Sequence, residues 1–88
     1  SNIDRVMAAS SAQIEDIRYL EKEMGLEKLP KNLGIMARLR LENPEASLVS
    51  LGELLEPPIG KSGVNARLRK IAEIARNLRS GEDTHLGN

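Results

Sequence analysis

The chain has 88 residues, one aromatic residue and no cysteine, so it is long enough for one small domain but cannot form a disulfide or a cysteine metal site. Its 13 basic and 13 acidic residues cancel to a formal net charge of zero. No apolar run approaches the roughly 20 residues that span a bilayer, and no signal peptide opens the chain. We therefore expect a cytoplasmic protein without a membrane segment.

The composition favours helices. Tyr19 is the sole aromatic residue, so Leu, Ile, Val, Met and Ala must form any core. Strands favour β-branched and aromatic residues, and this set suits short helices better. The sequence predicts an all-α fold, a small bundle of about four helices. We divide it into a long leading helix within 1–29, a core at 30–79 and a flexible tail at 80–88.

The first predicted helix covers residues 2–24. Mostly apolar residues recur there at spacings of three, four and seven, the pattern of a helix with one buried face. These residues are Ile3, Val6, Met7, Ser10, Ile14, Ile17 and Met24. Asn2 is a candidate N-cap, and Gly25 fits the position just after the helix. Four acidic residues offer a surface for a basic partner: Asp16, Glu21, Glu23 and Glu27.

The second predicted helix begins near Pro30, because proline is well placed in a first helical turn. It ends before Pro44, since the residue that precedes a proline avoids the α region. Three of its residues are expected to face the core: Leu33, Met36 and Ala37. Arg40 lies on the same stripe, and we expect it to be partly buried and paired with a carboxylate such as Glu53 or Glu56.

The third predicted helix is short and has Ser47 as its candidate N-cap. Its apolar residues are Leu48, Leu51, Leu54 and Leu55. Gly52 lies inside this helix, where glycine costs about 1 kcal/mol relative to alanine. A glycine at this position indicates that another helix approaches closely. Pro57 and Pro58 then end the helix.

The fourth predicted helix begins at Ser62, a candidate N-cap, and runs to Leu78 or Arg79. Its inner stripe is Val64, Leu68, Ile71, Ala75 and Leu78. Six basic residues and only one acidic residue, Glu73, lie between positions 61 and 79, a local net charge of +5. Such a localised basic segment is typical of a nucleic-acid reader, although a solvated arginine-rich helix has the same composition.

The tripeptide at positions 60–62, Gly-Lys-Ser, has two interpretations. A phosphate-binding P-loop ends in Gly-Lys-Ser, but it also requires another glycine five positions before the glycine of this tripeptide. Leu55 occupies that position here. Pro57 and Pro58 also lack the N–H groups that would bind phosphates. A short helix followed by a turn and a longer basic helix is instead a helix-turn-helix arrangement, in which the second helix enters the major groove of DNA.

A helical wheel places the candidate DNA-binding residues on the exposed face at the start of the basic helix. They are Lys61, Ser62, Gly63, Asn65, Ala66, Arg69 and Lys70. Backbone amides near Ser62 and Gly63 could hold a phosphate, and Arg69 and Asn65 have the donor geometry for guanine and adenine edges. Arg67 lies near the core edge, where we expect a local pair or a backbone contact. For each residue alone, plain solvent exposure remains an equal interpretation.

Four segments carry a resemblance to a known family: LP at 29–30, RLRLENPEASL at 38–48, LGELLEPP at 51–58 and KSGVNARLRKI at 61–71. With the leading helix, they resemble the C-terminal helix-turn-helix domain of the WhiA family of bacterial transcription factors. The resemblance implies a fold similar to region 4 of primary sigma factors. It also implies a polar residue, often histidine, at position 66, where this chain has Ala66.

The resemblance further implies an upstream domain related to LAGLIDADG homing endonucleases, without nuclease activity, which is missing from this chain. Family members bind promoter DNA and control sporulation or cell-division genes together with RNA polymerase and its sigma factor. We therefore expect a sequence-specific DNA-binding domain with double-stranded promoter DNA as its partner and a nucleoid-associated location. The alternative is an interaction module that docks a sigma factor or RNA polymerase.

Catalysis is not expected. The one histidine, His85, lies in the predicted tail with no cysteine or carboxylate cluster around it, and no paired-carboxylate or Ser–His arrangement has supporting context. The sequence accordingly predicts no catalytic residue, metal or cofactor.

Overall fold

The computed structural model describes the backbone of residues 2–87 and the side chains of residues 9–81. Four α-helices occur in this part of the chain: α1 (Asn2–Glu23), α2 (Lys31–Glu42), α3 (Leu48–Glu53) and α4 (Lys61–Gly87). A 3-10 turn, η1 (Leu26–Lys28), joins α1 to α2, and the described backbone contains no strand. The predicted all-α bundle of about four helices is confirmed. None of the described helices has the length and apolarity needed to cross a membrane.

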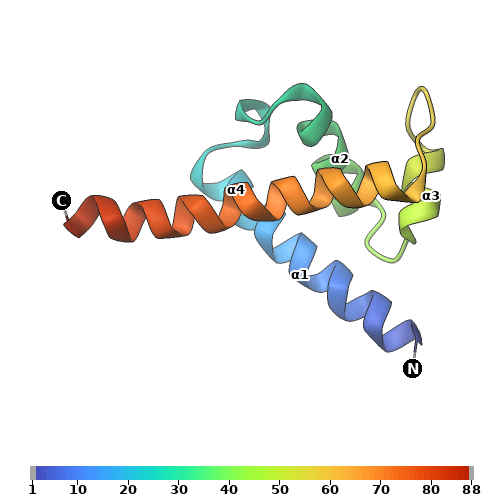
Figure 1. Cartoon of the computed structure of the whole chain (residues 1–88), viewed down its shortest axis with the longest axis horizontal. Helices are drawn as coiled ribbons and strands as arrows, with labels where there is room; N and C mark the ends of the chain where they lie inside the picture. The colour runs from blue at the N-terminus through green and yellow to red at the C-terminus, as the bar shows by residue number, and fades with distance from the viewer. Residues whose placement is uncertain (1, 88) are drawn as a thin grey trace.

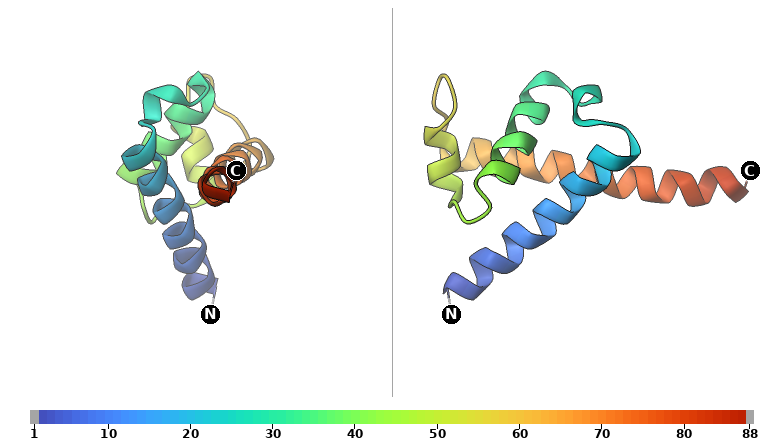
Figure 2. Two further views of the ribbon diagram at one scale, coloured as in Figure 1. Left: turned by 90° about the vertical axis from the view of Figure 1, so that its left-hand side faces the viewer. Right: turned by 180° about the vertical axis from the view of Figure 1, so that it is seen from behind.

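Helix α4 is the central element. It contacts each of the other three α-helices. In Figure 1 it runs horizontally through the molecule, with α3 at its N-terminal end and α1 crossing near its middle. In the left view of Figure 2, which looks roughly along α4, helices α1, α2 and α3 lie mainly to one side of it. The core therefore lies along one side of α4, and the opposite side remains available to solvent.

Helix α1 ends where the sequence predicts. The backbone N–H groups of Met24 and Gly25 both donate to the carbonyl oxygen of Leu20, at 2.9 and 3.0 Å. Gly25 then takes φ +84°, a conformation that favours glycine. Ser10 and Ile17 are buried as expected, whereas Leu20 is a buried residue that the predicted stripe omits. Asn2, Ile3, Val6 and Met7 lie outside the described side chains, and the candidate N-cap Asn2 is itself the first residue of α1.

A cationic side chain joins α1 to α4. Arg79 Nη1 donates to Asp16 Oδ1 at 2.9 Å, and its guanidinium lies 4.3 Å from the centre of the Tyr19 ring. The hydrogen bond to Asp16 raises the pKa of Arg79 above its ordinary value. Asp16 is consequently part of the helix packing and not a free member of the acidic surface expected on α1.

Helix α2 agrees closely with its prediction. Pro30 is the N-cap, one residue before the first helical residue, and the helix ends two residues before Pro44. The three residues expected to face the core are buried: Leu33, Met36 and Ala37. Leu26 and Leu29, in and just after η1, are also buried. The sequence pattern missed them because a three-residue turn has no periodicity to detect.

Two helix ends differ from the predictions. Helix α3 stops at Glu53, and the N–H groups of Leu54 and Leu55 bond three residues back, to the carbonyls of Leu51 and Gly52. This tighter turn leaves Leu54 53 % exposed while it buries Leu55. Helix α4 continues past Arg79 to Gly87, so the backbone predicted as a tail at 80–88 is helical as far as it is described. One glycine does not end a helix, and no proline follows Gly81 in the sequence.

Candidate nucleic-acid interface

The inner stripe of α4 determines which residues face outward. Val64, Leu68, Ile71 and Ala75 are buried, with exposed fractions of 0 to 3 %. Successive helical residues turn by about 100°, so residues between these positions project away from the core. The first ten residues of α4 therefore carry a defined outer face, as the helical wheel predicted.

Most of the predicted DNA-binding residues lie on that face, which we call the basic edge. Five are exposed and two are half-buried. The exposed ones are Lys61, Ser62, Ala66, Arg69 and Lys70, and the half-buried ones are Gly63 and Asn65. The basic edge is thus continuous over three helical turns, and Asn65 lies on the flank that turns toward α1 and α3.

The start of α4 differs by one residue from the prediction. The helix begins at Lys61, and the N–H of Val64 donates to the carbonyl of Gly60 at 3.1 Å. The first helical hydrogen bond is thus accepted by Gly60, the residue just before the helix. Ser62 is therefore inside the first turn and is not the N-cap. The N–H groups of Lys61, Ser62 and Gly63 have no carbonyl of a preceding turn to bond. The positive end of the helix dipole favours an anion at this point.

Helix α3 holds the start of α4 in place. The Ser47 side chain accepts a hydrogen bond from the N–H of Ser50 at 3.1 Å, which confirms the predicted N-cap. At the other end of α3, the N–H of Ile59 donates to the carbonyl of Gly52 at 3.1 Å. Leu51 is fully buried in the core that includes Val64. The turn between the two helices is thereby folded against α3, and the orientation of the basic edge follows from this packing.

The charges of the basic edge are largely uncompensated. Lys70 Nζ lies 3.4 Å from Glu73 Oε1, and both side chains are about half exposed, so this pair contributes little stability. No ion pair joins Lys61 or Arg69 to another described side chain. Arg67 is half-buried at the rim of a hollow that is also lined by Glu42 and Glu56. These features leave Lys61 and Arg69 available to an external anion.

Arg40 behaves differently from its prediction. It is only 2 % exposed, and its Nη1 donates to three backbone carbonyls, those of Asn43 at 3.1 Å, Pro44 at 3.4 Å and Ala46 at 2.8 Å. The expected pair with Glu53 or Glu56 is wrong, because the guanidinium instead closes the connection between α2 and α3. Burial lowers the pKa of Arg40 from its ordinary value. Its Nε has no hydrogen-bond partner.

Among the described residues, no group of three or more His, Asp or Glu side chains is placed where it could hold a metal ion. His85 lies outside the described side chains.

Residues 1–75 match the family model of the WhiA C-terminal HTH domain. The chain belongs to this family. A probable cell division protein WhiA of Clostridium perfringens is 56 % identical over 81 residues, which cover 92 % of this chain and 26 % of that protein. The corresponding protein of Clostridium acetobutylicum is 54 % identical over 79 residues, 90 % of this chain and 25 % of the relative. The chain thus spans about a quarter of the length of these WhiA proteins.

A solved structure supports the same assignment. The crystal structure of full-length DUF199/WhiA from Thermatoga maritima superimposes with a TM-score of 0.79 and 36 % sequence identity, over 86 % of this chain and 26 % of that one. The resemblance deduced from the four sequence segments is therefore confirmed. The matched WhiA family model is described as a helix-turn-helix domain.

Proposed function

We propose that this WhiA domain binds double-stranded DNA through the basic edge of α4. The observation that supports this most strongly is the contrast within one short segment, where Val64 and Leu68 are buried while Lys61, Arg69 and Lys70 are exposed. A helix that is anchored on one side and cationic on the other suits the major groove, whose phosphates attract the charges and whose base edges meet the side chains.

The residues have separate roles in this proposal. Lys61 and the free N–H groups of the first turn bind a backbone phosphate. Arg69 donates to the O6 and N7 atoms of guanine, and Asn65 reads an adenine edge on the flank of the helix. Lys70 adds a second phosphate contact, and Ala66 offers a methyl group for apolar contact with the methyl group of thymine.

The biological setting is part of the proposal. The relatives are called probable cell division proteins, and the family resemblance implies promoter binding in the cytoplasm, with control of sporulation or cell-division genes. We propose that the remaining three-quarters of the relatives' length includes the LAGLIDADG-like domain, which would increase the modest affinity of one basic helix.

The alternative, docking of a sigma factor or RNA polymerase on the acidic residues of α1 and η1, has weaker support. Asp16 is bonded to Arg79, and Glu21 lies 3.4 Å from Arg18. Of the four acidic residues, Glu23 and Glu27 are left exposed without a described partner, and two carboxylates provide little recognition for a basic partner.

Selection of bound duplexes from a random pool tests the proposed readout. The unmodified chain should enrich a common sequence, and Arg69→Ala should lose preference at one base pair, at a cost of about 1–3 kcal/mol. Arg76→Ala, which removes an exposed charge further along α4, is the matched control and should retain the sequence. Failure of the unmodified chain to enrich any sequence, or an unchanged sequence with Arg69→Ala, would refute base reading by this helix.

A further inference from the structure

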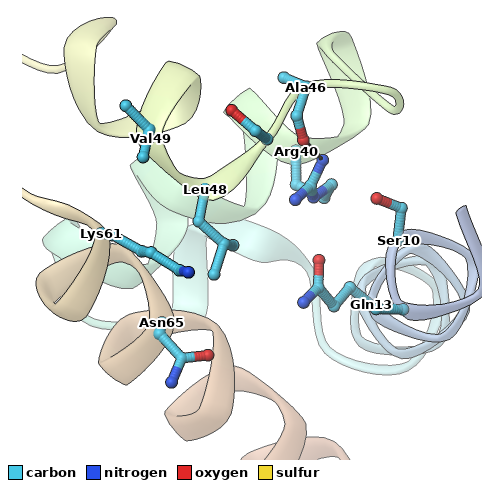
Figure 3. Close-up of a pocket in the computed structure, with 10 residues that line it drawn as sticks. Ser10, Gln13, Arg40, Ala46, Leu48, Val49, Lys61 and Asn65 are labelled. Carbon is cyan, nitrogen blue, oxygen red and sulfur yellow. Dashed lines mark hydrogen bonds between the residues drawn. The ribbon is translucent and has the colours of Figure 1, made fainter. Parts of the chain in front are cut away.

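A hollow of about 370 Å³ opens between α1, the start of α3 and the start of α4, beside the basic edge. Gln13 lines it from α1, Arg40 from α2, Leu48 and Val49 from α3, and Lys61 and Asn65 from α4. In Figure 3 the polar ends of Gln13, Arg40 and Lys61 point toward the space around Leu48. Its volume is within the range of about 300–1,000 Å³ that is typical of small-molecule sites.

The hollow is electropositive. Two of its lining residues, Arg40 and Lys61, are cationic, and no acidic residue is among the described residues that line it. Arg40 is only 2 % exposed, and no carboxylate among the described residues forms an ion pair with it. A buried charge that is compensated only by backbone carbonyls is costly, so an anion that entered the hollow would be attracted strongly.

Two residues that line the hollow also carry unsatisfied polar atoms. Arg40 Nε and Gln13 Oε1 are both buried and have no hydrogen-bond partner among the described residues. Buried polar groups nearly always have partners, so each exception requires an explanation. A half-turn of the Gln13 amide exchanges its oxygen and nitrogen, so the group can accept from a ligand hydroxyl or donate to an anion. Arg40 Nε is a donor only.

Leu48 and Val49 give the hollow an apolar wall. A ligand that matches both features has an anionic head for Arg40 and Lys61 and a compact apolar body against α3. We propose that this hollow binds a small organic oxyanion, a phosphate monoester or a carboxylate, and that Arg40, Gln13 and Lys61 contact its head. Because Lys61 also belongs to the basic edge, the bound anion lowers DNA affinity; this last step rests on the proposed function.

Nuclear magnetic resonance of the 88-residue chain tests the site without DNA. The probe is phenyl phosphate, with benzyl alcohol as the neutral comparator and inorganic phosphate as the head alone. Phenyl phosphate should shift the Arg40 Nε–H and the Gln13 side-chain amide signals in a saturable manner. Benzyl alcohol should bind at least about tenfold more weakly, because it carries no negative charge and has one acceptor oxygen where the phosphate has several. Shifts that never saturate, or equal binding of benzyl alcohol, would overturn the proposal.

Substitutions separate this site from general attraction to a basic surface. Gln13→Leu and Lys61→Ala should each weaken phenyl phosphate by about tenfold, the effect of losing one hydrogen bond to a charged group. Arg38→Ala removes an exposed charge from the same helix as Arg40 but lies outside the hollow, so affinity should stay within about twofold for this surface change. Equal losses in all three variants would indicate diffuse attraction and contradict a defined site.

Competition between phenyl phosphate and duplex DNA distinguishes failure of the proposed ligand site from failure of the proposed function. Phenyl phosphate at saturation should weaken duplex binding by the unmodified chain and have no effect on Lys61→Ala. A chain that binds phenyl phosphate but no duplex refutes the proposed function alone. Signals of Arg40 and Gln13 that respond to duplex but not to phenyl phosphate assign the hollow to a DNA phosphate and refute the free ligand.

Discussion

Gly52 of α3 lies directly against the backbone carbonyl of Ile59, in the turn that leads to α4. A Cβ atom at position 52 would overlap this oxygen and would also lie 3.1 Å from Val64 Cγ2. The same two residues are joined by the hydrogen bond from Ile59 N to Gly52 O. The glycine that appeared unfavourable in a helix is thus required by the close approach of the turn. Val64 of α4 also approaches it, as the sequence had suggested for another helix.

Gly52→Ala should lower the free energy of unfolding by about 1–3 kcal/mol, the usual cost of inserting an atom into packed structure, because backbone must move to admit the new methyl group. Chemical denaturation measures the change. Gly81→Ala is the matched control, since a Cβ there also meets nothing within 4 Å, and it should raise stability by no more than about 1 kcal/mol, because alanine favours an α-helix over glycine. Equal effects of the two substitutions would show that the contact with Ile59 does not determine the change in the free energy of unfolding.

Arg40→Met should also destabilise the fold, by about 1–3 kcal/mol, because the carbonyls of Asn43, Pro44 and Ala46 lose their shared donor. The thioether side chain fills part of the same volume, so lost packing is a small part of the effect. Arg38→Met removes an exposed arginine from the same helix and should alter stability by less than about 0.5 kcal/mol. A neutral result for Arg40→Met would mean that water replaces the guanidinium without cost.

Arg79→Ala should lower the thermal midpoint, because α4 loses its hydrogen bond to Asp16 and its contact with the Tyr19 ring. The ion-pair part of this loss is screened by salt, so the difference from the unmodified chain should shrink in 1 M sodium chloride. Arg76→Ala, an exposed neighbour on α4, should leave the midpoint nearly unchanged. If both variants melt alike at low salt, the link between α1 and α4 contributes nothing measurable.

Much of this fold could be predicted because the helices have strong, regular signals. Val64, Leu68, Ile71 and Ala75 repeat at helical spacing, and all are buried. Ser47 and Gly25 mark a helix start and a helix end through local backbone chemistry, which the sequence carries directly. The end of α3 was less predictable, because the exposure of Leu54 depends on a change from α-helical to tighter bonding over two residues.

The candidate site could be predicted only in part. The basic edge lies on one helix, so its orientation followed from periodicity. The hollow beside it is assembled from α1, α2, α3 and α4, and residues as far apart as Gln13 and Asn65 have no sequence signal that brings them together. The partners of Arg40 were also hidden, because they are backbone carbonyls, which every residue possesses.

The central claim is that the basic edge of α4 neutralises DNA phosphates, and salt-dependent binding tests it most directly. Fluorescence anisotropy with a labelled duplex gives the slope of log affinity against log salt for the unmodified chain and for Lys61→Ala/Lys70→Ala. Each phosphate contact adds about 0.9 to the magnitude of this slope, so the double variant should have a slope smaller by about 1.8. The control Arg18→Ala/Arg38→Ala removes the same charge from exposed positions on α1 and α2 and should keep the original slope. An identical slope for all three proteins, or binding that salt does not weaken, would contradict the account.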